Sequence, residues 1–229
     1  MKRSEINKTI QIFENFLFQM GVKLPPFFSF TPGEWLEKGS EYDEIRDNML
    51  GWDVTDYGLG NFRQTGLALC TIRNGNLKKK DLYPKTYAEK LIMSCENQIS
   101  PMHFHYNKME DIINRGGGNL MMHLYNSSAK GEFAPTDITV VSDGRKYVVP
   151  AGKVIRLRPG ESITLAPGQY HEFWAEEGMG PVLIGEVSAV NDDNTDNRFH
   201  KPLARFSVIQ EDEAPYRLLC SEYPKIKDN

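Results

Sequence analysis

The chain has 229 residues, a formal net charge of −4 at pH 7 and no basic run longer than residues 78–80. This balance excludes binding to nucleic acid through phosphate neutralisation, and no apolar stretch reaches the roughly 20 residues of a membrane-spanning helix. The three cysteines are widely spaced without a CxxC pair, which indicates neither a disulfide framework nor a cysteine zinc site. We expect a soluble, cytoplasmic protein with reduced thiols, no signal peptide, and no nucleic-acid or membrane partner.

The first 50 residues are predicted to be helical. Apolar residues from Ile6 to Met20 recur on one face of a helix, with Ser4 placed to cap it and Gly21 to end it. The sequence Thr31-Pro32-Gly33-Glu34 has the form of a capping box that opens a second, short helix. A third short helix is expected over about residues 41–50.

From Gly51 onward, short apolar runs alternate with Gly, Pro, Asn and Asp. The runs are LALCTIR, KLIMS, NLMMHLY, ITVVSDGRKYVVP, KVIRLRPGESITLAPG and PVLIGEVSAV. This spacing is typical of an all-β sandwich or barrel, and Asp143-Gly144 predicts a hairpin turn because both residues tolerate positive φ. We therefore expect one domain over residues 1–229, with a helical extension at 1–50 and a β-barrel with a C-terminal segment at 51–229.

Four side chains in two short segments have the character of a metal centre. HFHYNKME at 103–110 supplies His103, His105 and Glu110, and PGQYH at 167–171 supplies His171. Residues i and i+2 of a strand share a face, so an extended 101–106 would aim both imidazoles at one point. Glycines 116–118 mark a turn that lets the acid lie on the next strand. An octahedral divalent ion held by these four ligands keeps two positions open, and the absence of thiolates argues against a closed structural zinc site.

The spacing of these residues resembles the two cupin motifs. His103-x-His105-x4-Glu110-x6-Gly117 is similar to the first motif, and Gly160-x7-Gly168-x2-His171 is similar to the second. The resemblance implies a cupin, or jelly-roll-like, β-barrel.

Three positions depart from the cupin pattern. Asn97 stands where a glycine is usual, Ala166 where a proline is usual, and Ala175 where an asparagine is often found. These positions belong to turns and packing, so the departures leave the four ligands intact.

A narrower resemblance extends over almost the whole chain. The segments MKRSEIN, PMHFHYNKMEDIINRGGGNL, PGQYHEFWAEEG and GEVSAVNDDNTDN are similar to the cupin-type D-lyxose isomerases of bacteria. That resemblance implies a ketol-isomerase that interconverts D-lyxose and D-xylulose, and usually D-mannose and D-fructose. It also implies a divalent metal, commonly Mn²⁺, with Zn²⁺, Co²⁺, Fe²⁺ or Ni²⁺ as alternatives. Cupins often dimerise through their sheets, so a homodimer is expected, although the apolar N-terminal helix could cover either a partner or its own barrel.

Aldose–ketose isomerisation moves a proton between neighbouring carbons through an enediol that a metal can stabilise, and it needs a base and a proton donor. Lys108 lies between two ligands, where a nearby cation could lower its pKa; the alternative is an exposed turn lysine. Glu186 interrupts the apolar run VLIGEVSAV, and strand alternation places it on the face of Ile184 and Ser188, which could point inward. Both are candidate catalytic residues, and the assignment of the base stays open between them.

Lys90, Asp193 and Arg205 are candidate substrate-binding residues. A lysine that points from KLIMS into a barrel is costly unless it is paired or functional, and an outward Lys90 is the alternative. Asp193 lies in a polar loop that could overhang the barrel mouth or form a simple turn. Arg205 could orient sugar hydroxyls or make a structural ion pair.

Two other functions could use the same residues. A cupin dioxygenase would hold iron(II) with the same three histidines and one carboxylate. A non-enzymatic sugar sensor would keep the pocket without the chemistry. Lys108 and Glu186, together with the lack of a DNA-binding segment, favour the isomerase over the sensor. The isomerase could act by proton transfer or by hydride shift.

Overall fold

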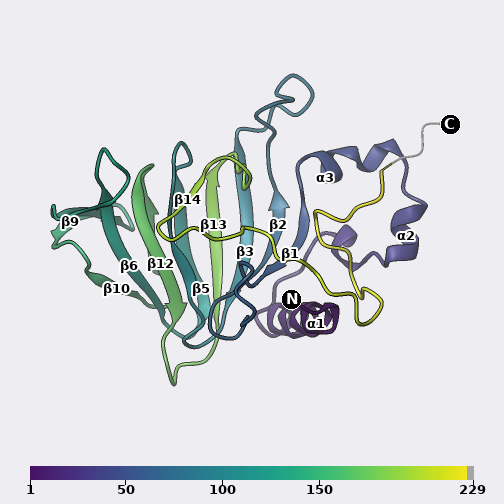
Figure 1. Cartoon of the computed structure of the whole chain (residues 1–229), viewed down its shortest axis with the longest axis horizontal. Coiled ribbons are helices and arrows are strands. Elements are labelled where there is room, and N and C mark those ends of the chain that lie inside the picture. Colours follow the sequence, from purple (N-terminus) through teal and green to yellow (C-terminus); the bar gives the residue numbers. More distant parts are fainter. Residues whose placement is uncertain (226–229) are drawn as a thin grey trace.

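Two antiparallel β-sheets packed face to face dominate the computed structural model, which describes residues 1–225 (Figure 1). The larger sheet has the order β1-β2-β3-β13-β5-β11-β8-β9. Its strands are β1 (Gly51–Thr55), β2 (Leu67–Arg73), β3 (Tyr87–Ser94), β13 (Val182–Ala189), β5 (Glu110–Gly117), β11 (Ser162–Leu165), β8 (Ile138–Ser142) and β9 (Arg145–Val149). The smaller sheet has the order β10-β6-β12-β4-β14, with β7 paired to β6. Its strands are β10 (Val154–Leu157), β6 (Leu120–Ser127), β12 (Gln169–Ala175), β4 (Ser100–His105), β14 (Asn197–Phe199) and β7 (Phe133–Ala134).

The helices precede the sheets in the chain. They are α1 (Arg3–Gln19), α2 (Pro32–Leu36) and α3 (Asp43–Asp47), with 3-10 turns at Pro26–Ser29 and Ser40–Tyr42. The expected β-rich, cupin-like fold with an N-terminal helical extension is therefore confirmed. The last four residues of the expected 51–229 segment lie outside the described residues.

The main core fills the space between the two sheets. Leu69, Ile92 and Ile184 enter it from the larger sheet, and Met122 and Phe173 enter it from the smaller one. Because successive side chains of a strand point to opposite faces, Lys90 on β3 and Glu186 on β13 share the inner face with Ile92 and Ile184. This alternation brings charged groups into the interior at one end of the core.

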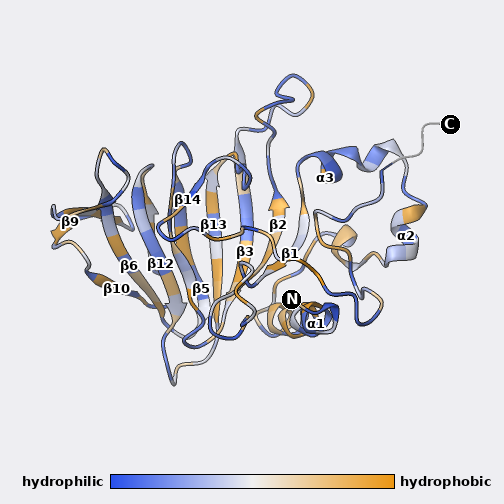
Figure 2. Cartoon of the chain, in the orientation of Figure 1, coloured by the Kyte–Doolittle hydropathy of each residue, from blue (hydrophilic) through white to orange (hydrophobic). Residues whose placement is uncertain are grey.

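Helix α1 covers the outer face of the larger sheet. Its buried residues Ile6, Ile10, Phe13 and Leu17 pack against a cluster that includes Trp52. Seen nearly end-on in Figure 2, the helix is hydrophobic on one side and hydrophilic on the other. Burial of each of these side chains stabilises the fold by roughly 1.5–3 kcal/mol. The sheet of the same chain therefore buries the apolar face of the helix. Of the two roles left open for the apolar helix face, the structure shows the second: it covers its own barrel.

The predicted helix signals are only partly confirmed. Gly21 follows the end of α1 with a φ of 72°, and Thr31 and Glu34 form the expected capping box of α2. The predicted cap of α1 is wrong, because Ser4 lies inside the helix and donates to a carboxylate oxygen of Asp212 at 2.7 Å. The same carboxylate accepts the Ser4 backbone N–H at 2.9 Å, so a residue far along the chain supplies the cap.

The third helix and the hairpin turn have opposite outcomes. The helix is shorter than predicted, since the helical turns from residue 40 end at 47. The hairpin turn is confirmed, with φ values of 50° at Asp143 and 77° at Gly144 between β8 and β9.

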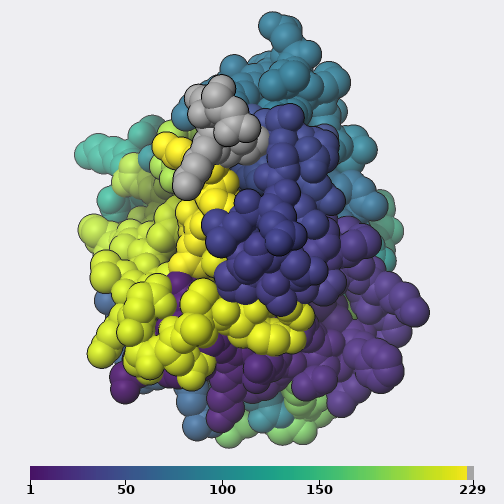
Figure 3. Space-filling view, turned by 90° about the vertical axis from the view of Figure 1, so that its right-hand side faces the viewer, coloured from purple at the N-terminus to yellow at the C-terminus, as the bar shows by residue number. Residues whose placement is uncertain are grey.

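The C-terminal segment, residues 200–225, has no helix or strand and returns to the start of the chain. It lies against α1 and the α2–α3 region, as the yellow, purple and dark blue surfaces of Figure 3 show. The buried guanidinium of Arg3 holds it by bonding the carboxylates of Glu211 and Glu222. Asn7 adds a hydrogen bond to Glu213 at 2.6 Å. The segment is thus docked by contacts from the N-terminal helix.

Candidate active site

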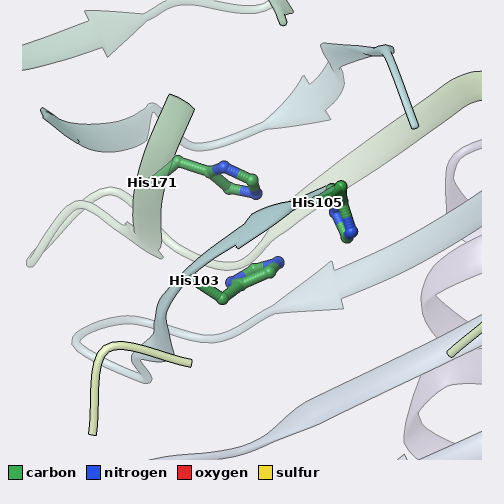
Figure 4. A group of neighbouring side chains, drawn as sticks. All are labelled: His103, His105 and His171. Carbon is green, nitrogen blue, oxygen red and sulfur yellow. The ribbon is translucent and has the colours of Figure 1, made fainter. Parts of the chain in front are cut away.

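Three histidines from the smaller sheet converge on one point (Figure 4). His103 and His105 lie on β4 two residues apart, and His171 lies on β12 directly opposite His103 in the strand register. One ring nitrogen of each lies within 4.8 Å of the other two, the arrangement of a shared cation site. The extended backbone at 100–105 produces this convergence, because i and i+2 share a face.

Glu110 approaches the same point from the opposite sheet. It begins β5, and its Oε1 lies 3.3 Å from Nε2 of His105 and 3.2 Å from Nε2 of His171. The four side chains therefore bridge the two sheets at one end of the core.

The hydrogen bonds of the imidazoles fix which nitrogens face the centre. Nδ1 of His103 lies 2.7 Å from the carbonyl oxygen of Pro101, and Nδ1 of His171 lies 3.1 Å from that of Gln169. A carbonyl oxygen only accepts, so each Nδ1 carries the proton and each Nε2 presents a lone pair. The lone pair of His171 then faces Glu110 Oε1, a buried atom that has no hydrogen-bond donor among residues 1–225. Two acceptors at this distance repel unless a cation lies between them, so the donor set fits a divalent metal.

The protonation states also fit a metal. Burial lowers the pKa of His103 and of His105, which keeps both imidazoles neutral near pH 7. Burial alone would raise the pKa of Glu110, but the Lys108 ammonium together with His105 and His171 outweighs burial and holds that pKa well below its usual range. Neutral histidines and an ionised carboxylate are the forms that bind a cation.

A buried chain of alternating charges leads away from the histidines. Lys108 Nζ lies 2.7 Å from Oε2 of Glu110 and 2.8 Å from Oε1 of Glu186. Lys90 Nζ lies 3.3 Å from the same oxygen of Glu186, its direct partner in the β3–β13 register. The side chains of both lysines and Glu186 are at most 7% exposed, so both strand residues point inward.

Two carboxylates determine the pKa of Lys108. Burial alone would lower this pKa, but the carboxylates of Glu110 and Glu186 outweigh burial and raise it above its ordinary value. Burial would likewise raise the pKa of Glu186, whereas Lys108 and Lys90 lower it. In this structure Lys108 is thus a protonated cation and Glu186 an ionised carboxylate, and a lowering of the Lys108 pKa by a bound metal stays a prediction.

A second ionic group closes the far end of the site. Arg205 Nη2 lies 2.6 Å from Oδ2 of Asp53 and 3.2 Å from Oδ2 of Asp193. Nη1 of Arg205 is buried and has no hydrogen-bond partner among the described residues. Burial would raise the pKa of Asp193, but Arg205, helped by Lys90, Lys108 and Asn191, outweighs burial and holds that pKa well below its usual range.

All nine candidate residues line one cavity between the sheets. The imidazoles and Glu110 occupy one end and Arg205 with Asp193 the other, while Tyr57, Phe173 and Phe199 add aromatic walls. A small polar molecule could therefore contact a metal at one end and hydrogen-bonding groups at the other.

Sequence reasoning missed several polar residues of the site, two of which bond the candidate substrate-binding residues directly. Asp53, which pairs with Arg205, lies in β1, and an acid inside the apolar run GWDVT was the available signal. Asn191 accepts from Lys90 Nζ at 2.7 Å and from Lys108 Nζ at 3.3 Å, and its amide nitrogen donates to Asp193 at 2.9 Å. It stands beside Asp193 in the polar run already singled out, but nothing local distinguishes it from a turn residue.

One departure from the cupin pattern has a structural reason. Asn97 has a φ of 59°, a left-handed conformation that glycine adopts freely and asparagine tolerates better than other residues. The turn before β4 thus keeps its shape without the glycine.

No helix within residues 1–225 is both long enough and apolar enough to cross a membrane.

Comparison with known proteins places this site in a family context. A sequence model of a family described as D-lyxose isomerase matches residues 1–223. The chain is 50% identical over 228 residues to the D-lyxose/D-mannose isomerase of Escherichia coli O157:H7, with 99% of this chain and 100% of that protein covered. It is 29% identical over 198 residues to the D-lyxose ketol-isomerase of Cohnella laeviribosi, with 77% and 100% covered.

Solved structures share the fold. The Acinetobacter sp. DL28 L-ribose isomerase in complex with L-ribose matches with a TM-score of 0.61 at 12% identity, over 92% of this chain and 98% of the other. The Cellulomonas parahominis L-ribose isomerase with L-ribose matches with a TM-score of 0.59 at 15% identity and the same coverage. At such identities the likeness concerns the fold alone.

Proposed function

This chain belongs to the D-lyxose isomerase family and is an aldose–ketose isomerase, and from that premise we propose that it interconverts D-lyxose and D-xylulose, and D-mannose and D-fructose. The observation that carries the proposal is the cavity in which three histidines and Glu110 face Lys108 and Glu186. The substrates come from the names of the relatives, and the unphosphorylated sugar fits a cavity in which Arg205, the one arginine lining it within residues 1–225, is already paired with two carboxylates.

We propose that His103, His105, Glu110 and His171 hold a divalent metal. The family resemblance favours Mn²⁺. When bound, such an ion supplies a Lewis acid for the sugar oxygens at carbons 1 and 2. The fixed Nε2 lone pairs and the unpartnered Glu110 oxygen support this ligand set.

Glu186 is the proposed base. It removes the proton from carbon 2 of the aldose and returns it to carbon 1. Over the same reaction the hydroxyl oxygen at carbon 2 loses its proton, and the carbonyl oxygen at carbon 1 gains one. Its lowered pKa keeps it ionised at neutral pH, which is the form that can accept a proton. Lys108, protonated and 2.8 Å from Glu186, holds that carboxylate in place and offers a donor to the oxygens.

The far end of the cavity is proposed to bind the remaining hydroxyls. Arg205 Nη1 is a buried donor without a partner, and a sugar hydroxyl would satisfy it. Asp193 and Lys90 lie beside it as an acceptor and a donor. Such contacts orient the sugar chain with carbons 1 and 2 toward the histidines.

The test is isomerisation in D₂O. Protein loaded with Mn²⁺ is incubated with D-lyxose, or with D-mannose, and the products are followed by NMR. We expect D-xylulose or D-fructose with deuterium at carbon 1, since a carboxyl proton exchanges with solvent. No turnover of either sugar would refute the substrate assignment, and turnover without deuterium would indicate a hydride shift. Chelated protein, with add-back of Mn²⁺, Zn²⁺, Co²⁺, Fe²⁺ or Ni²⁺, is the control for the metal.

A further inference from the structure

The turn that carries Lys108 lies outside the β-sheets. It spans residues 106–109 and joins β4 to β5. Its flanks are held by strand pairing, since His105 pairs with Asn197 and Glu110 pairs with both Leu165 and Ser188. Lys108 is not paired with a neighbouring strand, so other hydrogen bonds must set the position of its backbone.

Asp196 supplies those bonds from the loop that precedes β14. Its carboxylate accepts the backbone N–H of Asn107 at 2.8 Å, that of Lys108 at 2.9 Å and the side-chain amide of Asn107 at 2.9 Å. Its carbonyl oxygen also accepts the backbone N–H of Tyr106 at 3.1 Å. Asp196 is only 6% exposed.

No cation balances the Asp196 carboxylate in residues 1–225: none of the ion pairs of that part of the chain includes it. A buried carboxylate is stable there because it is surrounded by N–H donors of one turn. Its oxygens accept hydrogen bonds from residues 106–108, so these bonds connect the turn to Asp196.

We propose that Asp196 is a positioning residue that sets where the Lys108 ammonium sits between Glu110 and Glu186. The inference rests on the proposed function, because it assumes that Lys108 and Glu186 take part in proton transfer. The ammonium lies within 2.8 Å of both carboxylates, so a shift of its backbone by a fraction of that distance would break one contact. A displacement of about 1 Å in such a site can lower the rate by up to about 100-fold.

The metal ligands are not expected to move with Asp196. His105 and Glu110 keep their strand pairings, and Gly168 donates its backbone N–H to the carbonyl of His105 at 2.9 Å. The effect of losing Asp196 should therefore appear in turnover and leave the metal content unchanged.

The experiment compares Asp196→Asn with Asp192→Asn. The first change replaces one acceptor oxygen by an NH₂ group that cannot accept the turn N–H. The second makes the same charge change in the same loop, where the Asp192 carboxylate accepts hydrogen bonds from Asn194 and Thr195, and the Asp192 backbone carbonyl that accepts the Asp196 N–H is left in place. We expect Asp196→Asn to lower kcat about 10- to 100-fold, with KM and bound metal within about twofold of wild type. Asp192→Asn should match wild type.

Hydrogen exchange gives a readout that needs no activity. The amides of residues 106–109 should exchange faster in Asp196→Asn than in wild type or Asp192→Asn. Combining Asp196→Asn with Lys108→Met should lower kcat no further than Lys108→Met alone, since both changes disturb one group.

Unchanged exchange, additive losses in the double variant, or loss of metal from Asp196→Asn would each overturn the inference. Wild-type protein that does not isomerise either sugar would instead overturn the proposed function. If wild type is active and the two loop variants behave alike, only the positioning role of Asp196 fails.

Discussion

Replacement of Arg3 by methionine tests whether the N-terminal helix controls the far end of the active site. The guanidinium is 2% exposed and donates to Glu211 at 2.7 and 2.8 Å and to Glu222 at 3.1 Å. Glu211 follows Arg205 by six residues in a segment without strands or helices. The Arg3 contacts therefore help to hold the backbone from which Arg205 reaches into the cavity.

The cost of Arg3→Met follows from the exposure of its partners. Loss of one member of a fully buried ion pair costs about 3–5 kcal/mol, because the other charge stays buried. Here Glu211 is 57% and Glu222 22% exposed, so both carboxylates regain water when the guanidinium is removed. We expect a loss of about 1–3 kcal/mol, which for a chain of this size lowers Tm by about 2–12 °C.

The functional effect should be selective. Lys108, Glu186 and the proposed metal ligands belong to the sheets or the turn between strands, whereas Arg205 belongs to the docked segment. We expect KM for the sugar to rise several-fold while kcat stays within about a factor of two, since binding at the far end is weakened and the reacting end is untouched.

The assay combines thermal unfolding with steady-state kinetics. Arg156→Met is the matched control, because Arg156 pairs with Glu176 on the opposite side of the fold and is 49% exposed. That variant should lose at most about 1 kcal/mol and keep its KM. A lowered Tm with an unchanged KM in Arg3→Met would refute the link to Arg205, and an unchanged Tm would refute the energetic reasoning.

Four further outcomes are expected. Glu186→Gln should lower kcat by about 10²- to 10⁴-fold with its metal content unchanged; a variant that keeps wild-type turnover and deuterium incorporation would exclude Glu186 as the base. His103→Ala should lose metal and activity together while its circular dichroism stays β-rich, and elemental analysis checks this. Since Arg205 holds the pKa of Asp193 below its ordinary value, Asp193 should stabilise the fold above about pH 4 and lose that contribution as pH falls through the lowered pKa. In urea unfolding between pH 3 and 6, the free energy of unfolding should therefore fall less steeply with decreasing pH for Asp193→Asn than for wild type. Asn97→Gly should have a Tm at or above that of wild type, whereas Asn97→Ala should be less stable than wild type by about 1 kcal/mol. Equal Tm values for the two variants would contradict the role of positive φ.

The features of the fold that the sequence predicts are those that depend on near neighbours. The apolar face of α1, the capping box at Thr31, the turn at Asp143 and the i, i+2 pair of His103 and His105 all arise from spacing within a few residues. Glu186 was placed on the inner face because alternation along a strand is a local rule.

What could not be predicted depends on residues that are distant in the chain. The cap of α1 comes from Asp212, and the role of Asp53 depends on its ion pair with Arg205, which is 152 residues away in the chain. The direction of the Lys108 pKa depends on two carboxylates that converge from β5 and β13, which spacing alone does not reveal. The homodimer stays a prediction, which light scattering tests directly.

The docking of the C-terminal segment on α1 also has a consequence for the order of folding. Arg3 and Glu222 are separated by 219 positions, so their contact closes one of the longest loops that this chain can form. Contacts of such separation form late, because the entropy of closing the loop is recovered only after the shorter pairings are in place. All four proposed metal ligands lie between residues 103 and 171, within strands that pair over shorter separations. A folding chain should therefore acquire its capacity for metal before its capacity for sugar, and pulsed hydrogen exchange would show β4 and β12 protected ahead of the amides around Arg205.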